Sequence, residues 1–418
     1  MKTAILHYSA APVVGGVEAV MHAHAEMFIA AGLNLTLIAG RGDQKAMPLG
    51  VDFIQIDEID SMHPQISTAT QALNQGIVPE SFEKLVDLLV FRLRPILSEF
   101  DHLIIHNVLT KHFNLPLTAA LFRLMDEGII RHTIAWNHDL TWSSPNSRSK
   151  VYSSYPWELL KTIHSRVTYV AISEKRREEV VDTFGCASEK VHVIYNGVDP
   201  VTLFGLSSDG FDLIKRLDLL PADLILLMPV RVTKAKNIEY AIELVQALKM
   251  AGCRPKLVLT GPPDPHDISS MAYYQELIHL RKQLDVENEM KFVFDSGPAP
   301  GENFFIGQQV VSELYRVADA MLMPSHREGF GMPILEAGLL GLPVISTPVP
   351  ALNELVKEKA LVFSPAAPPA QLAEQILSWM NAKPEHLLRV KVRQNYTWEA
   401  IFLKEILPLL ESKIQNEG

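Results

Sequence analysis

Residues 326–343 read HREGFGMPILEAGLLGLP. Just before them, residues 320–324 form an apolar run that ends in a proline, which is typical of the end of a buried parallel strand. Gly329 and Gly331 let the backbone turn sharply and approach a ligand closely, and Pro333 has the fixed φ that suits the first position of a helix. The stretch therefore predicts a strand followed by a glycine loop and a short helix.

The same stretch carries signals that end the helix. Gly341 is placed to end it, Pro343 prevents its continuation, and residues 344–346 resume a strand. A helix start of this kind presents free N–H groups and a positive dipole end, which together bind phosphate or carboxylate. Glu328 in the loop and Glu336 in the first turn or so of the helix lie eight residues apart. Each carboxylate taken singly is more often a helix cap than a ligand group.

The combination is more specific than its parts. Glu, Gly-Phe-Gly, Pro, Glu-Ala and Gly-x-Pro-Val at this spacing resemble the Glu-x7-Glu signature of retaining glycosyltransferases with the GT-B fold, the large family that includes sucrose and trehalose synthases and bacterial mannosyltransferases. The resemblance implies that Glu328 contacts the transferred sugar and that Glu336 binds the donor ribose. It also implies further donor-binding positions in this stretch: Gly329, Phe330, Gly331, Ile334 and Leu335.

The resemblance covers nearly the whole chain and implies its architecture. The fold class expected is α/β, with two Rossmann-like doubly wound domains that face each other across a cleft. Residues 196–200 look like the family's interdomain boundary. The expected domains are an acceptor-side domain at residues 1–200, a donor domain at residues 201–395, and a helix at residues 396–418 that returns to the first domain.

Strand and helix patterns alternate along the sequence, which independently indicates parallel, doubly wound sheets. Strand patterns occur at residues 3–7, 35–39, 52–56, 103–106, 133–136, 167–172, 191–195, 224–230, 256–260, 291–294, 344–346 and 361–363. Helix patterns occur at residues 19–32, 64–73, 81–100, 115–127, 273–284, 310–318, 370–379 and 398–410. A short helix is also expected within residues 203–220, and another after residue 237.

Composition narrows the class of protein. A chain of 418 residues with 48% hydrophobic content suits two domains, and a net charge of −10 argues against wide contact with nucleic acid. Only Cys186 and Cys253 are present, so a reducing, cytoplasmic location is expected, without a disulfide framework or a cysteine-rich zinc site. No membrane span is expected, and polar residues at 7–9 favour a first strand over a signal peptide.

Two features of the first half point to function. Gly15 and Gly16 follow the first strand, where the resemblance implies a loop that binds a phosphate or the acceptor, although most glycine pairs are only turns. His138 follows the strand at residues 133–136, and residues just beyond such a strand line the ligand crevice. A lone histidine is more often structural, but the family has an active-site histidine at this point. Residues 144–155 then form either a mobile loop over the acceptor or a plain surface loop.

A basic loop follows the first strand of the second half. Arg231 and Lys236 lie in RVTKAKN, and two cations at a strand end fit a diphosphate, since arginine can bond it in a bidentate way and lysine adds a point charge. A solvated basic turn is the alternative. With Asn237, the loop resembles the family's Arg-x4-Lys-Asn pattern, which implies that both cations hold the diphosphate and stabilise the departing charge.

Together with these residues, the resemblance implies transfer of a hexosyl group, glucose or mannose, from a nucleoside-diphosphate sugar to a small soluble sugar-like acceptor, with His138, Arg231, Lys236 and Glu328 as the catalytic set. The family is generally assigned a front-side displacement with retention. The sequence contains no Asp-x-Asp, so neither a metal nor another cofactor is expected.

Three alternatives remain at this level. A lipid-linked or cell-envelope acceptor is one, because the helix pattern at residues 81–100 carries three cations among apolar residues. A catalytically silent nucleotide-sugar-binding subunit is another. A glycoside hydrolase would need two carboxylates roughly 5 to 9.5 Å apart. Glu328 and Glu336 could satisfy this distance, but the phosphate site formed by the loop and helix around them favours a transferase.

Overall fold

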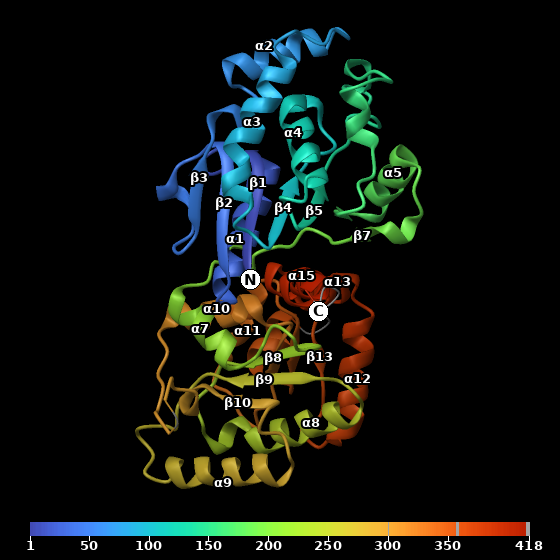
Figure 1. Ribbon diagram of the computed structural model, residues 1–418. Helices are drawn as coiled ribbons and strands as arrows, with labels where there is room; N and C mark the ends of the chain where they lie inside the picture. The colour runs from blue at the N-terminus through green and yellow to red at the C-terminus, as the bar shows by residue number, and fades with distance from the viewer. Residues whose placement is uncertain (300, 357–358, 415–418) are drawn as a thin grey trace. The chain divides into compact units, whose positions relative to one another are not determined.

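The computed structural model describes residues 1–299, 301–356 and 359–414. The chain divides into two compact units, each with its own parallel sheet (Figure 1). Unit 1 comprises Met1–Gly197 and Trp398–Gly418, and unit 2 comprises Val198–Thr397.

Unit 1 is built on a seven-stranded sheet in the order β3-β2-β1-β4-β5-β6-β7, with all pairs parallel. The strands are β1 (Lys2–Ser9), β2 (Asn34–Arg41), β3 (Asp52–Gln55), β4 (His102–His106), β5 (His132–Asn137), β6 (Val167–Ala171) and β7 (Val191–Val193). The helices are α1 (Gly16–Ala30), α2 (Pro64–Leu73), α3 (Phe82–Leu97), α4 (Leu115–Asp126) and α5 (Glu174–Phe184). The strand order reverses between β1 and β4, which is where ligands bind in open sheets of this kind.

Successive residues of β1 face two different cores of unit 1. Leu6 packs in the core beneath α3 and α4, whereas Ile5 packs in the core beneath α1. The second core also receives the end of the chain, which forms α14 (Trp398–Ile401), a π-helical turn (Phe402–Ile406) and α15 (Leu407–Ile414). Phe402 packs edge-on against Phe28 of α1, with ring centroids 5.1 Å apart.

Unit 2 repeats the plan with six parallel strands in the order β10-β9-β8-β11-β12-β13. The strands are β8 (Leu224–Met228), β9 (Pro255–Leu259), β10 (Met290–Phe292), β11 (Ala320–Met323), β12 (Val344–Ser346) and β13 (Leu361–Val362). The helices are α6 (Pro200–Phe204), α7 (Ser208–Arg216), α8 (Ile238–Met250), α9 (Ser270–Gln283), α10 (Gln308–Val317), α11 (Met332–Leu339), α12 (Pro369–Asn381) and α13 (Pro384–Asn395). One core lies beneath α8, α9 and α12, and the other beneath α7, α10 and α11.

The prediction of two Rossmann-like doubly wound domains is confirmed, and these are the domains from which the GT-B fold is built. The sequence patterns miss α5 and α13, which bury few apolar side chains: α5 buries Val180, and the buried residues of α13 are His386 and Arg393. The strand expected at residues 291–294 is wrong at its end, because a 3-10 turn begins at Val293. No helix in the described ranges is long and apolar enough to cross a membrane.

Candidate functional site

The glycine loop and α11 follow β11 in unit 2. Gly331 has φ 101°, a left-handed conformation that favours glycine, and α11 begins at Met332 with Pro333 as its second residue. At the other end, Gly341 has φ 67°, and the N–H of Leu342 donates to the carbonyl of Ala337 at 2.8 Å. The helix therefore starts and stops through these glycines.

The loop before α11 offers unpaired donors. Among the described residues, the backbone N–H groups of Gly329, Phe330 and Gly331 find no hydrogen-bond acceptor. The N–H of Ile334 donates to the carbonyl of Gly331 at 3.0 Å, and Pro333 has no backbone N–H to donate. An anion would thus be bound by the loop backbone, with support from the positive end of the helix dipole.

Two predicted donor-binding side chains of α11 differ in exposure. Ile334 is 1% exposed and packs in the core, so its side chain does not line a binding surface, whereas Leu335 is exposed, as is Phe330 in the loop. The helical period explains the difference, because adjacent positions on a helix point in different directions.

Glu336 is the fifth residue of α11 and so lies in the second turn, beyond the N-terminal capping positions. Its Oε2 accepts a hydrogen bond from the hydroxyl of Tyr315 in α10 at 2.6 Å. Burial raises the pKa of Tyr315, and the neighbouring carboxylate raises it further. Tyr315 therefore remains a neutral donor that orients Glu336.

Glu328 and Lys236, which the sequence assigns to the sugar and the diphosphate, form an ion pair. Glu328 Oε1 accepts from Lys236 Nζ at 2.6 Å and from Ser325 Oγ at 2.7 Å. The side chains of Glu328 and Lys236 are 9% and 21% exposed. Both bonds reach one carboxylate oxygen, and Oε2 has no hydrogen-bond partner among the described residues.

Backbone contacts join the basic loop to the glycine loop. The N–H of His326 donates to the carbonyl of Ala235 at 2.9 Å, and the amide Nδ2 of Asn237 donates to the carbonyl of Pro324 at 3.2 Å. Asn237 has φ 52° at the start of α8, a conformation that asparagine tolerates better than most residues. The ion pair between these loops is therefore held by a fixed frame.

Arg231 differs from Lys236 in being open to solvent. Its side chain is 59% exposed, and its Nη1 lies 3.8 Å from Asp264 Oδ1. Its backbone is held on both sides, because the N–H of Gly261 donates to the carbonyl of Val230 at 3.0 Å and the N–H of Val232 donates to the carbonyl of Pro262 at 3.1 Å. The guanidinium can therefore turn toward an anionic ligand while the loop stays in place.

In unit 1, His138 follows β5 and is held through its backbone. Asn107, with φ 61°, accepts the N–H of His138 at 2.8 Å and that of Asp139 at 3.1 Å through Oδ1. The imidazole of His138 stacks on that of His106, and His106 Nδ1 lies 2.9 Å from His138 Nε2.

The protonation of these rings follows from their burial. Burial lowers the pKa of His138 to about 4, with His7 adding to the effect, and it lowers the pKa of His106 well below its usual value. Two neutral rings share a single proton across the contact. His106 Nε2 is buried without a partner, and a buried N–H without an acceptor is rarer than a bare acceptor. A proton on His106 Nδ1 is thus favoured, which leaves the Nδ1–H of His138 as a donor.

The paired glycines lie between β1 and α1. Gly15 has extended backbone, and a Cβ there would lie 2.2 Å from Glu18 Oε2. Glu18 also accepts a hydrogen bond from Ser9 Oγ at 2.6 Å through Oε1. A carboxylate therefore lies at the positive end of α1, beside Gly15 and Gly16.

The sequence reading misses several partners of its own site residues: Ser325, Tyr315, His106, Asn107 and Glu18. His106 and Asn107 lie at the end of β4, so the rule that strand ends line the crevice could have found them. Within the described ranges, no three or more histidine, cysteine, aspartate or glutamate side chains are grouped to hold a metal ion.

Comparisons with known proteins cover both units. Residues 212–396 match the family described as glycosyl transferases group 1, and residues 14–201 match the family described as glycosyltransferase family 4. An uncharacterized glycosyltransferase of Methanocaldococcus jannaschii is 29% identical over 204 residues, 48% of this chain and 47% of that protein. A D-inositol 3-phosphate glycosyltransferase of Actinosynnema mirum is 27% identical over 191 residues, 45% of this chain and 43% of that protein.

The chain therefore spans less than half the length of these relatives. Among solved structures, a glycosyltransferase of Rickettsia africae is 18% identical, with 99% of each chain covered and a TM-score of 0.38.

Proposed function

The chain belongs to the glycosyltransferases of group 1, and from this premise we propose that it transfers a hexosyl group, glucose or mannose, from a nucleoside-diphosphate sugar to an acceptor hydroxyl, with retention and without a metal. The observation that carries the proposal is the pairing of Lys236 with Glu328 next to a glycine loop with unpaired N–H groups. This places a cation, a carboxylate and backbone donors in one frame.

The diphosphate is the part of the donor that these groups fit best. Lys236 and Arg231 supply positive charge, and the backbone of Gly329, Phe330 and Gly331 supplies hydrogen bonds. As the sugar–phosphate bond breaks, negative charge develops on the leaving diphosphate. Lys236, already held in place by its ion pair with Glu328, can stabilise the transition state without reorganising, which is the usual basis of electrostatic catalysis.

The two carboxylates then bind different parts of the donor. Glu328 has one oxygen bound by Lys236 and Ser325, so its Oε2 is free to accept from a sugar hydroxyl. Glu336, oriented by Tyr315, accepts from the ribose hydroxyls.

On unit 1, we assign His138 to a hydroxyl of the transferred sugar, to which its Nδ1–H would donate. Glu18 disfavours a phosphate at Gly15 and Gly16, since like charges repel at that helix start. These glycines suit the neutral hydroxyls of a sugar-like acceptor better, so we assign them to the acceptor, one of the two ligands that the resemblance implies.

Release of nucleoside diphosphate tests the proposal. UDP-, GDP- and ADP-sugars should be screened by thermal shift, because a ligand that binds the native state raises its stability. The donor that raises Tm is then incubated with candidate sugar acceptors, and nucleoside diphosphate is measured. A donor that stabilises the protein but is never turned over with any acceptor would favour the silent binding subunit.

Chelation tests the metal-free part. Because Arg231, Lys236 and the loop N–H groups supply the positive field, turnover should be the same with and without EDTA. Loss of turnover in EDTA that Mg²⁺ or Mn²⁺ restores would reject this part.

A further inference from the structure

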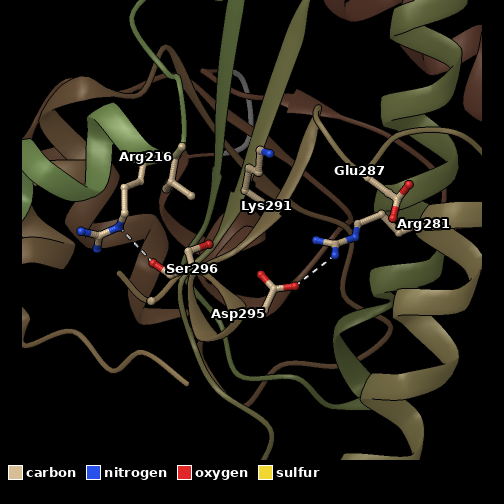
Figure 2. A pocket seen from close by; sticks show the side chains of 8 residues that line it. Arg216, Arg281, Glu287, Lys291, Asp295 and Ser296 are labelled. Atoms are coloured by element: carbon tan, nitrogen blue, oxygen red, sulfur yellow. Dashed lines mark hydrogen bonds and ion pairs between the residues drawn. The ribbon is translucent and has the colours of Figure 1, made fainter. Parts of the chain in front are cut away.

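A cavity of about 390 Å³ lies along β10, an edge strand of the sheet of unit 2 (Figure 2). It is lined by the ends of α7 and α9, by β10 and by the turn that follows β10. None of the residues that line it belongs to the basic loop at 231–237 or to the glycine loop. The cavity is therefore separate from the donor residues described above.

Two arginines at this cavity are held by neighbouring groups. Arg216 donates from Nε to the carbonyl of Ser296 at 3.1 Å. Arg281 donates from Nη2 to Asp295 Oδ2 at 3.0 Å, and its side chain is 12% exposed. Arg281 Nε is buried and has no hydrogen-bond partner. Figure 2 shows both side chains among those that line the cavity, with Lys291 between them.

Lys291 forms no ion pair among the described residues. No carboxylate in that part of the chain lies within 4.0 Å of its ammonium. The two nearby aspartates pair with other cations, Asp295 with Arg281 and Asp218 with Lys256. Burial lowers the pKa of Lys291, and the nearby charges of Lys256 and Arg281 lower it further, whereas Asp295 and Asp218 act in the opposite direction. A bound anion would relieve both effects.

The size of the cavity and its charges indicate the ligand. Its volume is at the lower end of the range for small-molecule sites, roughly 300 to 1,000 Å³, and exceeds what one phosphate ion would fill. Phosphate oxygens accept charge-assisted hydrogen bonds from lysine and arginine. Glu287 also lines the cavity, and its carboxylate can accept from hydroxyl groups.

We propose that this cavity binds a phosphate monoester of a small sugar, with the phosphate at Lys291 between Arg216 and Arg281 and the sugar hydroxyls toward Glu287. The site lies outside the proposed donor residues and needs no turnover to be occupied.

Calorimetry on the intact chain tests the proposal, with glucose 6-phosphate as the probe and with inorganic phosphate and glucose as separate arms. Glucose 6-phosphate should bind, inorganic phosphate more weakly, and glucose not at all. Lys291→Met keeps the alkyl stem and removes the charge, so affinity should fall by about tenfold or more. Arg216→Gln should lower affinity in the same direction.

Two controls locate the binding. Lys282→Met removes an exposed charge from α9 outside the cavity lining and should leave affinity unchanged. Lys236→Ala removes the donor-site cation and should also leave affinity unchanged. Equal losses in Lys291→Met and Lys282→Met, loss of binding in Lys236→Ala, or no binding at all would overturn the site. An equal affinity for inorganic phosphate would overturn the assignment to a sugar phosphate.

Discussion

Unit 1 contains buried, neutral histidines, and its candidate residue His138 is one of them, whereas the candidate residues Glu328 and Lys236 of unit 2 form an ion pair. Burial lowers the pKa of six histidines of unit 1: His7, His24, His102, His106, His112 and His138. In the described part of unit 2, His386 has a lowered pKa. Unit 1 therefore positions donors and acceptors without net charge, which suits hydroxyls, and unit 2 positions opposite charges, which suit a diphosphate.

The largest expected difference between the units is in their response to acid: acidification should destabilise unit 1 much more than unit 2. The buried histidines have folded-state pKa values below the unfolded value of about 6.5, for example about 3 for His24 and about 4 for His138. Between these values the unfolded chain binds more protons, so the stability is present above about pH 6.5 and is lost as the pH falls toward 4. Each histidine costs about 1.4 kcal/mol per pH unit in this window, so unit 1 should lose several kcal/mol between about pH 7 and pH 5.

Hydrogen exchange measures this effect in each unit. After correction for intrinsic rates, protection in β4 should fall on acidification far more than protection in β8. His24→Phe should reduce the pH dependence, while His22→Phe, at an exposed position of the same helix, should not. Parallel losses of protection in both units would contradict the contrast.

The next largest effect is expected on kcat/KM when Lys236 of unit 2 is replaced. Lys236→Met takes a cation from the diphosphate and also leaves Glu328 without its ion-pair partner. Charged hydrogen bonds are worth about 1.5 to 3 kcal/mol each, so kcat/KM should fall about a hundredfold or more. Arg231→Gln should cost only about tenfold, because Arg231 is exposed and its charge is screened by water.

Steady-state kinetics with the stabilising donor would measure both losses. Lys234→Met removes a neighbouring cation of the same loop and serves as the matched control, with little expected change. If all three variants lost activity equally, general loop charge would explain the data better than the paired lysine.

The two glutamates should divide kcat from KM. Charge develops on the sugar only as its bond to phosphate breaks, so a contact there is felt mainly in the transition state. Glu328→Gln should therefore lower kcat, by about tenfold, more than it raises donor KM. Glu336→Gln should mainly raise donor KM, and Tyr315→Phe should shift KM the same way by removing the hydroxyl that orients Glu336.

Thermal shift on each variant checks that it stays folded. If both glutamate variants changed stability alike and kept normal activity per folded molecule, the carboxylates would be structural groups and the donor assignment would be lost.

How far the sequence predicts the fold depends on what each element buries. Apolar residues recur at regular intervals in β1 and α3, and α11 lies between glycines. Hydrophobic periodicity and turn residues in the sequence therefore predict these elements. The same method does not find α13, because its buried Arg393 is paired with Asp319 and donates to the carbonyls of Leu220 and Ala222. Asp319 lies just before β11, far from α13 in the sequence, so this partner leaves no local signal.

The same limit applies to the candidate site: local sequence patterns identify single residues, but not the contacts between residues that are far apart in the sequence. Local spacing brings out Glu328 and Lys236 separately, but not the bond between them, because 92 residues separate the two. Ser325 is three residues from Glu328 and could be suspected, since a short hydroxyl side chain reaches that far. The influence of Glu18 on Gly15 depends on how its side chain folds back, which composition does not reveal.

The smallest expected effect concerns the neutral histidine pair of unit 1, His106 and His138. If His106 Nδ1–H donates to His138 Nε2, then His106→Phe keeps the ring but removes the donor, whereas His106→Asn keeps an N–H close to the position of Nδ1. A neutral hydrogen bond contributes about 0.5 to 1.5 kcal/mol, so His106→Phe should lower kcat/KM about threefold to tenfold and His106→Asn less. Nitrogen-15 NMR of the imidazoles gives a readout that a purely structural role would not move: His138 should be the Nδ1–H tautomer in the native protein and in His106→Asn, and a mixture in His106→Phe. An Nε2–H tautomer of His138 in the native protein would reverse the donor and acceptor in this pair, and unit 1 would then present an acceptor rather than a donor to the sugar.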